Sequence, residues 1–277
     1  MILIAQLSDL HLVPEGTLCY GRVDTNQLAR QAVEAINRLN TPADAVVVTG
    51  DIIDTAKAKD YALAKDILGR LEVPFYLVSG NHDISTGFTA GFGDYGFANH
   101  PFPDRLCYAV DVGHIRLVIL DSSVPRAPHG ALSSEQLSFL DRELAAANGR
   151  PAIVAVHHPP IATGNQTMDR FALANPAELA AVVGKHSNVQ RLLCGHCHRT
   201  VFGAFAGTTV VIGPSTGHQL ELALDGDDTF GFNLEPPSFL LHRWTQDGGL
   251  TTELAMVDRY PGPYPFAWSP KGATPDG

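Results

Sequence analysis

Seven side chains that can bind metal ions stand directly after predicted strands, at five separate points along the sequence. They offer only carboxylate, amide and imidazole donors, which suits iron, manganese, zinc or cobalt and disfavours a thiolate site. One ion usually takes about four to six donors, so this set predicts two ions that share a ligand. The candidate metal ligands are Asp9, His11, Asp51, Asn81, His157, His196 and His198.

Asp51 is the residue best placed to bridge the two ions. It follows Gly50, which permits a sharp turn, and the apolar run 46–48. We therefore expect this carboxylate at the carboxyl end of a buried strand, where open α/β sheets bind their ligands. A metal pair roughly 3.5–4 Å apart clamps the attacking and leaving oxygens in phosphoryl transfer and lowers the pKa of bound water. The set predicts hydrolysis of a phosphoester by a metal-bridging hydroxide.

The segments that carry these side chains alternate between strand-like and helix-like patterns. Apolar and β-branched runs predict strands at 2–7, 46–48, 75–78, 115–120, 152–156, 189–194 and 210–212, and a closing hairpin at 239–244 and 250–257. Helical spacing predicts helices at 26–39, 58–71 and 177–183, and a capping box from Ser133 to Gln136 opens a fourth. In an extended chain, residues two apart point the same way. We therefore expect Asp9 to point with His11, and His196 with His198.

Each signal alone has an ordinary structural interpretation. An Asp-x-His triplet is common, and Gly-Asp after a strand is often only a turn, but five such strand ends in one chain are hard to explain as turns. Cys194 and Cys197 form a C-x-x-C without a second pair, and Cys194 continues a predicted buried strand, so both thiols are interpreted as structural. His158 is not predicted as a ligand, because one strand end cannot easily aim two consecutive side chains at one ion.

Composition excludes several classes of function. The chain has 277 residues, 45% of them hydrophobic, and a formal net charge of -10 without a block of Lys or Arg. This charge argues against a nucleic-acid surface and against attraction to anionic membranes. No apolar stretch approaches the roughly 20 residues that span a bilayer. Four cysteines without framework spacing fit a reducing cytoplasm.

The motifs, taken in order, resemble those of the calcineurin-like metallophosphoesterase superfamily. The resemblance covers all five motifs, from the Asp-x-His at 9–11 through Gly-Asp at 50–51, Gly-Asn-His-Asp at 80–83 and His157 to Gly-His-x-His at 195–198. The segment 18–24 and the residues 157–165 resemble a bacterial branch that includes glycerophosphodiester phosphodiesterases and class III cyclic-nucleotide phosphodiesterases. The fold class implied is α/β, a four-layer α/β/β/α sandwich of two mixed sheets flanked by helices.

The resemblance also implies a role for each side chain. One metal would be held by Asp9, His11, Asp51 and His198, and the second by Asp51, Asn81, His157 and His196. His82 would be the catalytic residue, facing the substrate to stabilise the transition state or protonate the leaving oxygen, with Asp54 or Asp83 orienting its neighbours. His218 matches a substrate-pocket histidine, and Tyr20 and Arg22 are placed where they either line the pocket mouth or belong to an ordinary surface loop.

The leading hypothesis is a dinuclear-metal phosphodiesterase that acts on small, glycerophosphodiester-like substrates. The alternative is a 3′,5′-cyclic-nucleotide (cAMP or cGMP) phosphodiesterase with the same centre. A more distant alternative is a non-catalytic metal-holding interaction module, which predicts missing ligands or a lost His82, and neither is missing here. The expected cofactors are two divalent or mixed-valence ions. The resemblance implies a homo-oligomer, and the cysteine usage indicates the cytoplasm.

Domain organisation is simple on this interpretation. Residues 1–260 are predicted to form one catalytic domain, and the proline-rich residues 261–277 a tail that wraps the surface or is mobile. The segment 85–105, heavy in Gly, Phe and Pro, is predicted to be a loop. Either 85–105 or 225–232 is a candidate cap or subunit interface.

Overall fold

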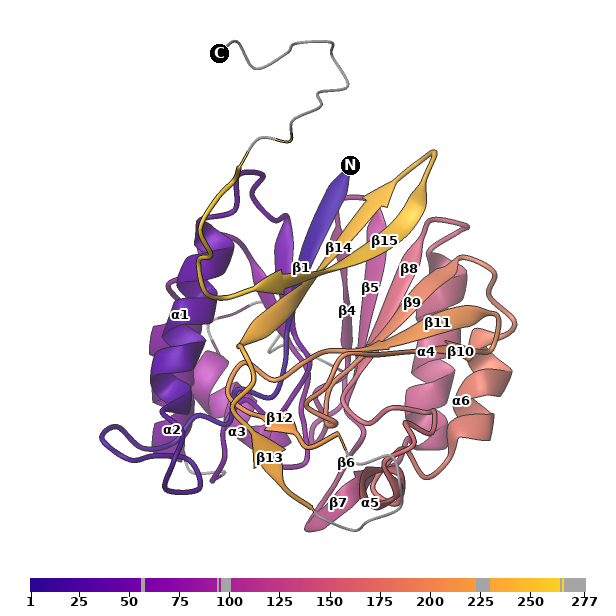
Figure 1. Cartoon of the computed structure of the whole chain (residues 1–277). Helices are drawn as coiled ribbons and strands as arrows, with labels where there is room; N and C mark the ends of the chain where they lie inside the picture. The colour runs from indigo at the N-terminus through magenta and orange to yellow at the C-terminus, as the bar shows by residue number, and fades with distance from the viewer. Residues whose placement is uncertain (56–57, 94, 96–100, 223–229, 265, 267–277) are drawn as a thin grey trace.

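Two mixed β-sheets stack face to face, and helices cover the outer face of each (Figure 1). The computed structural model describes residues 1–55, 58–93, 95, 101–222, 230–264 and 266. The first sheet has the order β15-β14-β1-β2-β3, with bounds Gly249–Met256, Ser238–Thr245, Ile2–Leu7, Ala45–Val48 and Phe75–Leu77. The second has the order β10-β11-β9-β8-β5-β4, with bounds Val201–Phe205, Thr208–Ile212, Val189–Cys194, Ala152–Val156, Ile115–Leu120 and Tyr108–Val112. The predicted four-layer sandwich is confirmed.

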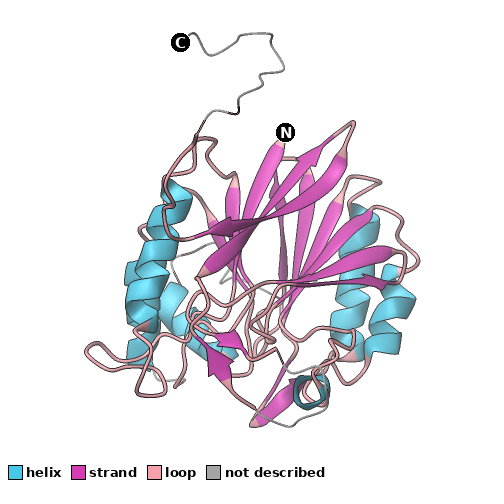
Figure 2. Ribbon diagram, in the orientation of Figure 1, coloured by secondary structure: helices cyan, strands magenta, loops and turns pink. Residues whose placement is uncertain are grey.

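The helices divide between the two outer faces (Figure 2). The first sheet packs against α1 (Thr25–Asn37), α2 (Ala58–Leu68) and α3 (Ser85–Phe92), and the second against α4 (Ser134–Ala146) and α6 (Pro176–Val183). The predicted capping box is present at α4, where Ser133 Oγ accepts from the backbone N–H of Gln136 and the Gln136 side chain accepts from Ser133 N. The short elements α5 (Gln166–Asp169), β6 (Ser123–Val124), β7 (Ala127–Gly130), β12 (Gln219–Leu220) and β13 (Phe232–Asn233) gather at one end of the sandwich.

The core lies mainly between the sheets. All residues of β1, β2 and β8 are buried, as strands covered on both faces must be. Side chains from both sheets, among them Ile4, Val47, Ile153 and Leu193, belong to one apolar cluster. Removal of this surface from water is the main force that holds the layers together. β1, β2 and β3 run parallel, as do β5, β8, β9 and β11, so their carboxyl ends define one edge in each sheet.

Gln6 ties the two sheets together just below that edge. Its buried amide nitrogen donates to Thr49 Oγ1 (3.0 Å) and, across the sandwich, to the carbonyl oxygen of Cys194 (2.8 Å). Its carbonyl oxygen lies 2.9 Å from Nε2 of His242, which must donate because an amide oxygen only accepts. The pair of Gln6 and His242 keeps buried polar groups satisfied. The two bonds from the Gln6 amide nitrogen also fix the spacing between the ends of β2 and β9, which carry the site.

The structure corrects one prediction in the segment 85–105, whose described part is not all loop. Residues Ser85–Phe92 form α3, which packs on α2. A Cβ on Gly87 would lie 2.3 Å from Cε2 of Tyr61, and one on Gly91 would lie 2.7 Å from Tyr61 Cβ. These glycines therefore permit close helix packing rather than a loop. The strands β4 and β10, which the sequence did not predict, pair antiparallel at the two edges of the second sheet.

Other outcomes concern the ends of the helices and the segments that lie outside the described residues. α1 and α2 end two and three residues earlier than expected, at Asn37 and Leu68. Most of the predicted tail 261–277 and of the candidate cap 225–232 lies outside the described residues. In the part of the chain that the structure describes, no helix is both long enough and apolar enough to cross a membrane.

Candidate metal centre

Left-handed backbone turns, rather than an extended chain, orient the candidate ligands. The expectation that 9–11 and 196–198 are extended is wrong, because both candidate ligands in each segment have a backbone in the left-handed region. A non-glycine residue there costs roughly 1–2 kcal/mol, and such strain gathers at functional sites. Backbone hydrogen bonds from Asp9 N to Gly50 O (3.1 Å) and from His11 N to Asp51 O (2.9 Å) hold two of the turns. The ligand residues concerned are Asp9 (φ 51°), His11 (φ 44°), Asp51 (φ 48°), His196 (φ 72°) and His198 (φ 49°).

Two glycines let the ligand segments approach one another. Gly50 has φ 98°, and a Cβ there would lie 2.3 Å from Nδ1 of His157. A Cβ on Gly80 would lie 2.2 Å from Oδ1 of Asp51. Neither space admits a side chain. Gly50 and Gly80 therefore allow the strand ends to come into contact, in addition to permitting the turns before Asp51 and Asn81.

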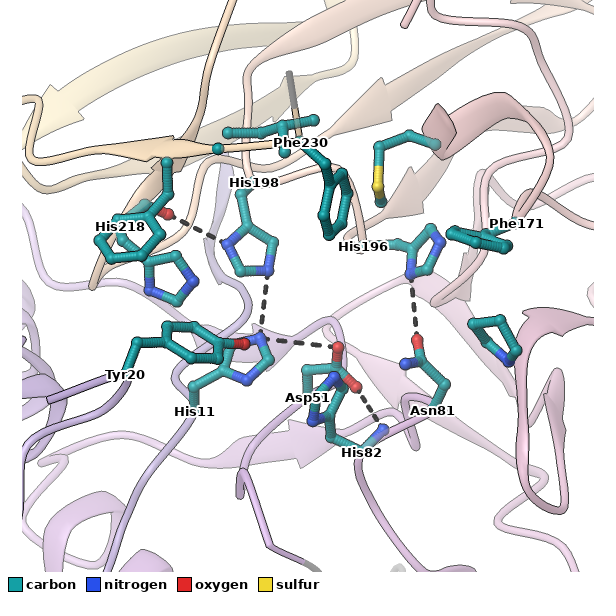
Figure 3. A pocket seen from close by; sticks show the side chains of 15 residues that line it. His11, Tyr20, Asp51, Asn81, His82, Phe171, His196, His198, His218 and Phe230 are labelled. Carbon is teal, nitrogen blue, oxygen red and sulfur yellow. Dashed lines mark hydrogen bonds and ion pairs between the residues drawn. The ribbon is translucent and has the colours of Figure 1, made fainter. Parts of the chain in front are cut away.

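The first group of donors joins Asp9, His11, Asp51 and His198, with one ligand atom of each within 4.8 Å of the others. The Nε2 atoms of His11 and His198 are 3.1 Å apart (Figure 3). Nδ1 of His198 lies 3.0 Å from the carbonyl oxygen of His218 and must donate to it, so in the neutral ring Nε2 carries a lone pair. Burial lowers the pKa of His198 well below its usual value, which keeps the ring neutral. A bound cation is the group that such a convergence of lone pairs fits.

The second group converges on the side-chain oxygen of Asn81. Nδ1 of His196 lies 3.0 Å from it and Nε2 of His157 lies 3.2 Å from it. Nδ1 of His157 donates to the carbonyl oxygen of Thr49 (2.8 Å), which turns Nε2 toward the site. The same Nε2 is 3.4 Å from Oδ2 of Asp51. These are the donors that the resemblance implies for a second ion.

Asp51 stands between the two groups. Its Oδ2 is 3.6 Å from Nε2 of His11 on one side and 3.4 Å from Nε2 of His157 on the other. Its Oδ1 accepts the backbone N–H of His82 at 2.9 Å, which fixes the carboxylate plane. The position is the one expected of a bridging ligand.

The electrostatics of the site favour positive charge. Burial by itself lowers the pKa of His157, but the charges of Asp51 and Asp9 outweigh it and raise the pKa to about 9. Burial raises the pKa of Asp9 to about 6, against the attraction of His157 and with the repulsion of Asp51. Two fully buried carboxylates therefore create a field that holds a proton on a histidine that would otherwise lose it. The donor types, their convergence and this field all fit divalent cations.

His158 belongs to a different network from its neighbour. Its Nε2 lies 3.1 Å from the carbonyl oxygen of Pro128 and must donate to it, so Nδ1 accepts from Ser122 Oγ at 2.8 Å. His158 lies within reach of His157 and His196, but both of its ring nitrogens already have partners. That His158 is not a ligand stays a prediction, and these two hydrogen bonds are consistent with it.

His82 lies beside the metal ligands and reaches the pocket. Its side chain is 34% exposed, its ring centroid is 4.7 Å from that of His11, and its Nδ1 lies 3.2 Å from the carbonyl oxygen of Asp54. Asp54 also holds Nδ1 of His11 at 3.2 Å. Buried Asp83 accepts from three backbone N–H groups, at positions 52, 53 and 80, and so fixes the loop that carries His82. Asp54 thus contacts both His11 and His82, and Asp83 contacts the backbone on either side of the site.

The predicted substrate residues fall on both sides of the pocket boundary. Tyr20 and His218 line the pocket, with their rings edge to face at 5.3 Å. Burial lowers the pKa of His218 to about 4, so the ring is neutral near pH 7. Arg22 is exposed and does not contribute to the pocket lining.

The pocket itself is about 550 Å³ in volume and has largely apolar walls. Figure 3 shows Phe230 above the ligand set, Phe171 at its right beside His196, and Tyr20 at its left. Residues 225–232 were predicted as a candidate cap, but the other wall residues were missed, because they come from the short elements β7, α5 and β12 and from a loop, none of which carries a motif. Those missed residues are Pro128, Met168, Phe171 and Leu220.

Comparison with known proteins agrees with this site. The calcineurin-like phosphoesterase family matches residues 2–200. A probable glycerophosphodiester phosphodiesterase (GpdQ) of Arcobacter nitrofigilis is 35% identical over 96% of this chain and 97% of its own length. A 3′,5′-cyclic adenosine monophosphate phosphodiesterase (CpdA) of Pseudomonas aeruginosa is 30% identical over 93% of this chain and 90% of its own.

A solved structure supports the fold assignment. A dimetal phosphatase from Danio rerio superimposes with a TM-score of 0.67 at 14% identity, covering 93% of this chain and 99% of that one. At that identity the likeness concerns the fold alone. With the family match and the full-length relatives, the result is clear: the chain belongs to the calcineurin-like phosphoesterase family.

Proposed function

We propose that the protein is a metal-dependent phosphodiesterase whose substrates are small glycerophosphodiesters. The observation that carries the proposal is a pair of donor groups that share Asp51 at the floor of one pocket. The relative from Arcobacter, similar over nearly its whole length, supports a glycerophosphodiester substrate. We propose Asp9, His11, Asp51 and His198 for one ion, and Asp51, Asn81, His157 and His196 for the other.

The bound ions would supply Lewis acidity and an activated water at this site. The protein's own side chains would position the substrate and protonate its leaving group. The half-exposed ring of His82 stands at the pocket surface next to Asp51, where it can donate a proton to an alkoxide leaving group. The apolar walls limit water around the substrate, which strengthens every charge interaction inside. His218 and Tyr20 would contact the substrate from the opposite wall.

The identity of the ions and the assembly are further proposals. Oxygen and imidazole donors without thiolate favour Fe, Mn, Zn or Co. The family resemblance favours a homo-oligomer, and four cysteines without framework spacing favour the cytoplasm. Metal analysis of the purified protein and sedimentation equilibrium test these two points.

Removal of one ligand tests the centre directly. We expect Asn81→Ala and Asp51→Ala to lower turnover of a chromogenic phosphodiester by at least about a hundredfold, since loss of an outer partner alone costs 10–100-fold. Both variants should also bind less metal. Wild-type rates in either variant would overturn the assignment, and so would an anomalous signal from a single ion in metal-replete crystals.

A cyclic-nucleotide phosphodiesterase is the second candidate, because several relatives similar over about nine-tenths of the chain carry that description. Incubation with glycerophosphoethanolamine and with 3′,5′-cAMP, each with Mn(II), separates the two. We expect the glycerophosphodiester to be turned over with the higher kcat/KM. The opposite ranking would favour the second candidate.

A further inference from the structure

A second pocket lies on the other side of His82. It is about 530 Å³ in volume, nearly the size of the first. Asn81 and His82 line both pockets, so the two cavities meet at the candidate metal centre. A phosphate bound at that centre would thus have one cavity on each side. A phosphodiester carries one substituent on each side of its phosphorus.

The two cavities differ in chemistry. The first is walled mainly by aromatic and aliphatic side chains, and among the described residues that line it Asp51 is the one carboxylate. The second contains two guanidinium groups, from Arg105 and Arg126, as well as Asp83 and Asp104. Asp83 is buried and already accepts three backbone N–H groups, so it offers little to a ligand. An anionic group on a substrate arm would therefore find guanidinium partners in the second cavity, whereas the described residues that line the first include no Arg or Lys.

The two arginines differ in their contacts, but both could bind an anionic group. Arg105 donates to the carbonyl oxygen of Ser123 and lies 4.0 Å from Oδ1 of buried Asp121, contacts that orient its guanidinium while leaving the side chain 32% exposed. Arg126, in the turn between β6 and β7, is exposed and has no hydrogen bond or ion pair with any described residue. A guanidinium binds carboxylate or phosphate in a fixed, two-pronged geometry.

We propose that this second cavity, the arginine pocket, binds the second arm of the diester and selects an arm that carries a carboxylate or phosphate group. The inference rests on the proposed function and refines it. The substrate class is an acyclic diester with one neutral or apolar arm and one arm that carries a carboxylate or phosphate group. A cyclic nucleotide has both ester oxygens in one ring and one substituent, so it would leave the arginine pocket empty.

A matched pair of substrates tests the proposal. Glycerophosphoserine differs from glycerophosphoethanolamine by one carboxylate on the same arm. We expect the metal-loaded wild-type protein to show a kcat/KM about tenfold higher for glycerophosphoserine, the ratio that one charge-assisted hydrogen bond typically confers at a partly exposed site. The ratio should fall as NaCl is raised, because salt screens exposed charges.

The variant Arg126→Gln should bring the ratio close to one. It retains a long polar L-residue at φ 63° and so leaves the backbone demand unchanged. Arg243→Gln is the control, since Arg243 is a half-exposed arginine on β14, remote from both cavities, and its ratio should match the wild type. Free inorganic phosphate and free serine should not restore the ratio in Arg126→Gln.

The outcomes separate the two claims. If the metal-loaded protein hydrolyses neither diester, the proposed function fails and the inference fails with it. If it hydrolyses both with a ratio near one, or with a ratio insensitive to salt, the arginine pocket does not select an anionic arm, while the phosphodiesterase proposal stands. A ratio that survives in Arg126→Gln would also overturn the inference.

Discussion

Replacement of Gly50 by alanine should displace the imidazole of His157 and so weaken metal binding at the candidate centre. The new Cβ would lie 2.3 Å from Nδ1 of His157, 2.8 Å from its Cγ and 3.0 Å from the backbone nitrogen of Gly80. The first contact falls on the atom that donates to Thr49 O. The imidazole must therefore shift or rotate, and its Nε2 would no longer point toward Asp51 and Asn81.

Two contributions set the magnitude. Alanine at φ 98° costs roughly 1–2 kcal/mol of backbone strain, and an overpacked buried contact costs roughly 1–3 kcal/mol. Together they lower the free energy of unfolding by about 2–5 kcal/mol. Loss of the hydrogen bond that orients a ligand imidazole typically lowers metal affinity about 10–100-fold.

Gly149→Ala is the matched control. Gly149 has φ 80°, but no atom lies within 4 Å of the position its Cβ would take. That variant should show the backbone contribution alone, with metal affinity unchanged. Urea unfolding of both metal-free variants gives the two free energies, and competition with a chromogenic chelator gives the affinities. If Gly50→Ala lost no more stability than Gly149→Ala and bound metal as tightly as the wild type, the packing argument would be wrong.

Three further predictions follow from the same site. In the metal-free protein, the pKa of His157 is about 9 in the folded state and 6.5 ordinarily. Its protonation therefore stabilises the fold fully below about pH 6.5, and this stabilisation of up to about 3 kcal/mol is lost as the pH rises through 9. Urea unfolding with EDTA should show the decline, and saturating Mn(II) should abolish it. His82→Gln should slow glycerophosphoethanolamine hydrolysis about 10²–10⁴-fold but bis(p-nitrophenyl) phosphate far less, because nitrophenolate leaves without a proton; equal losses on both would refute proton donation. His158→Ala should retain both ions by metal analysis while His157→Ala loses at least one, and loss from His158→Ala alone would reverse their roles.

The predicted strands and the order of motifs follow from local chemistry that any reader of the sequence can see. The run of valines in β2 has no polar face, so it had to be a strand covered on both sides. Gly-Asp, Gly-Asn-His and Gly-His after such strands place donors at carboxyl ends, which the described structure brings together. Local pattern also gave the capping box of α4.

Other features were beyond a local pattern. Gly87 and Gly91 suggested a loop, because nothing nearby in the sequence shows that Tyr61 occupies the space a side chain would need. The edge strands β4 and β10 lack a continuous buried run, so their pairing depends on the partner strands β5 and β11.

The sequence by itself determined which atoms can bind cations and in which order along the chain they occur. Only the tertiary structure decided how they are aimed. Left-handed turns at Asp9 and His11, rather than extended chain, direct the donors. Hydrogen bonds that Nδ1 donates to distant carbonyl oxygens determine that Nε2 of His157 and of His198 faces the site. Such contacts join residues far apart in the chain, and so do the walls of the two pockets, because both depend on how the sheets stack.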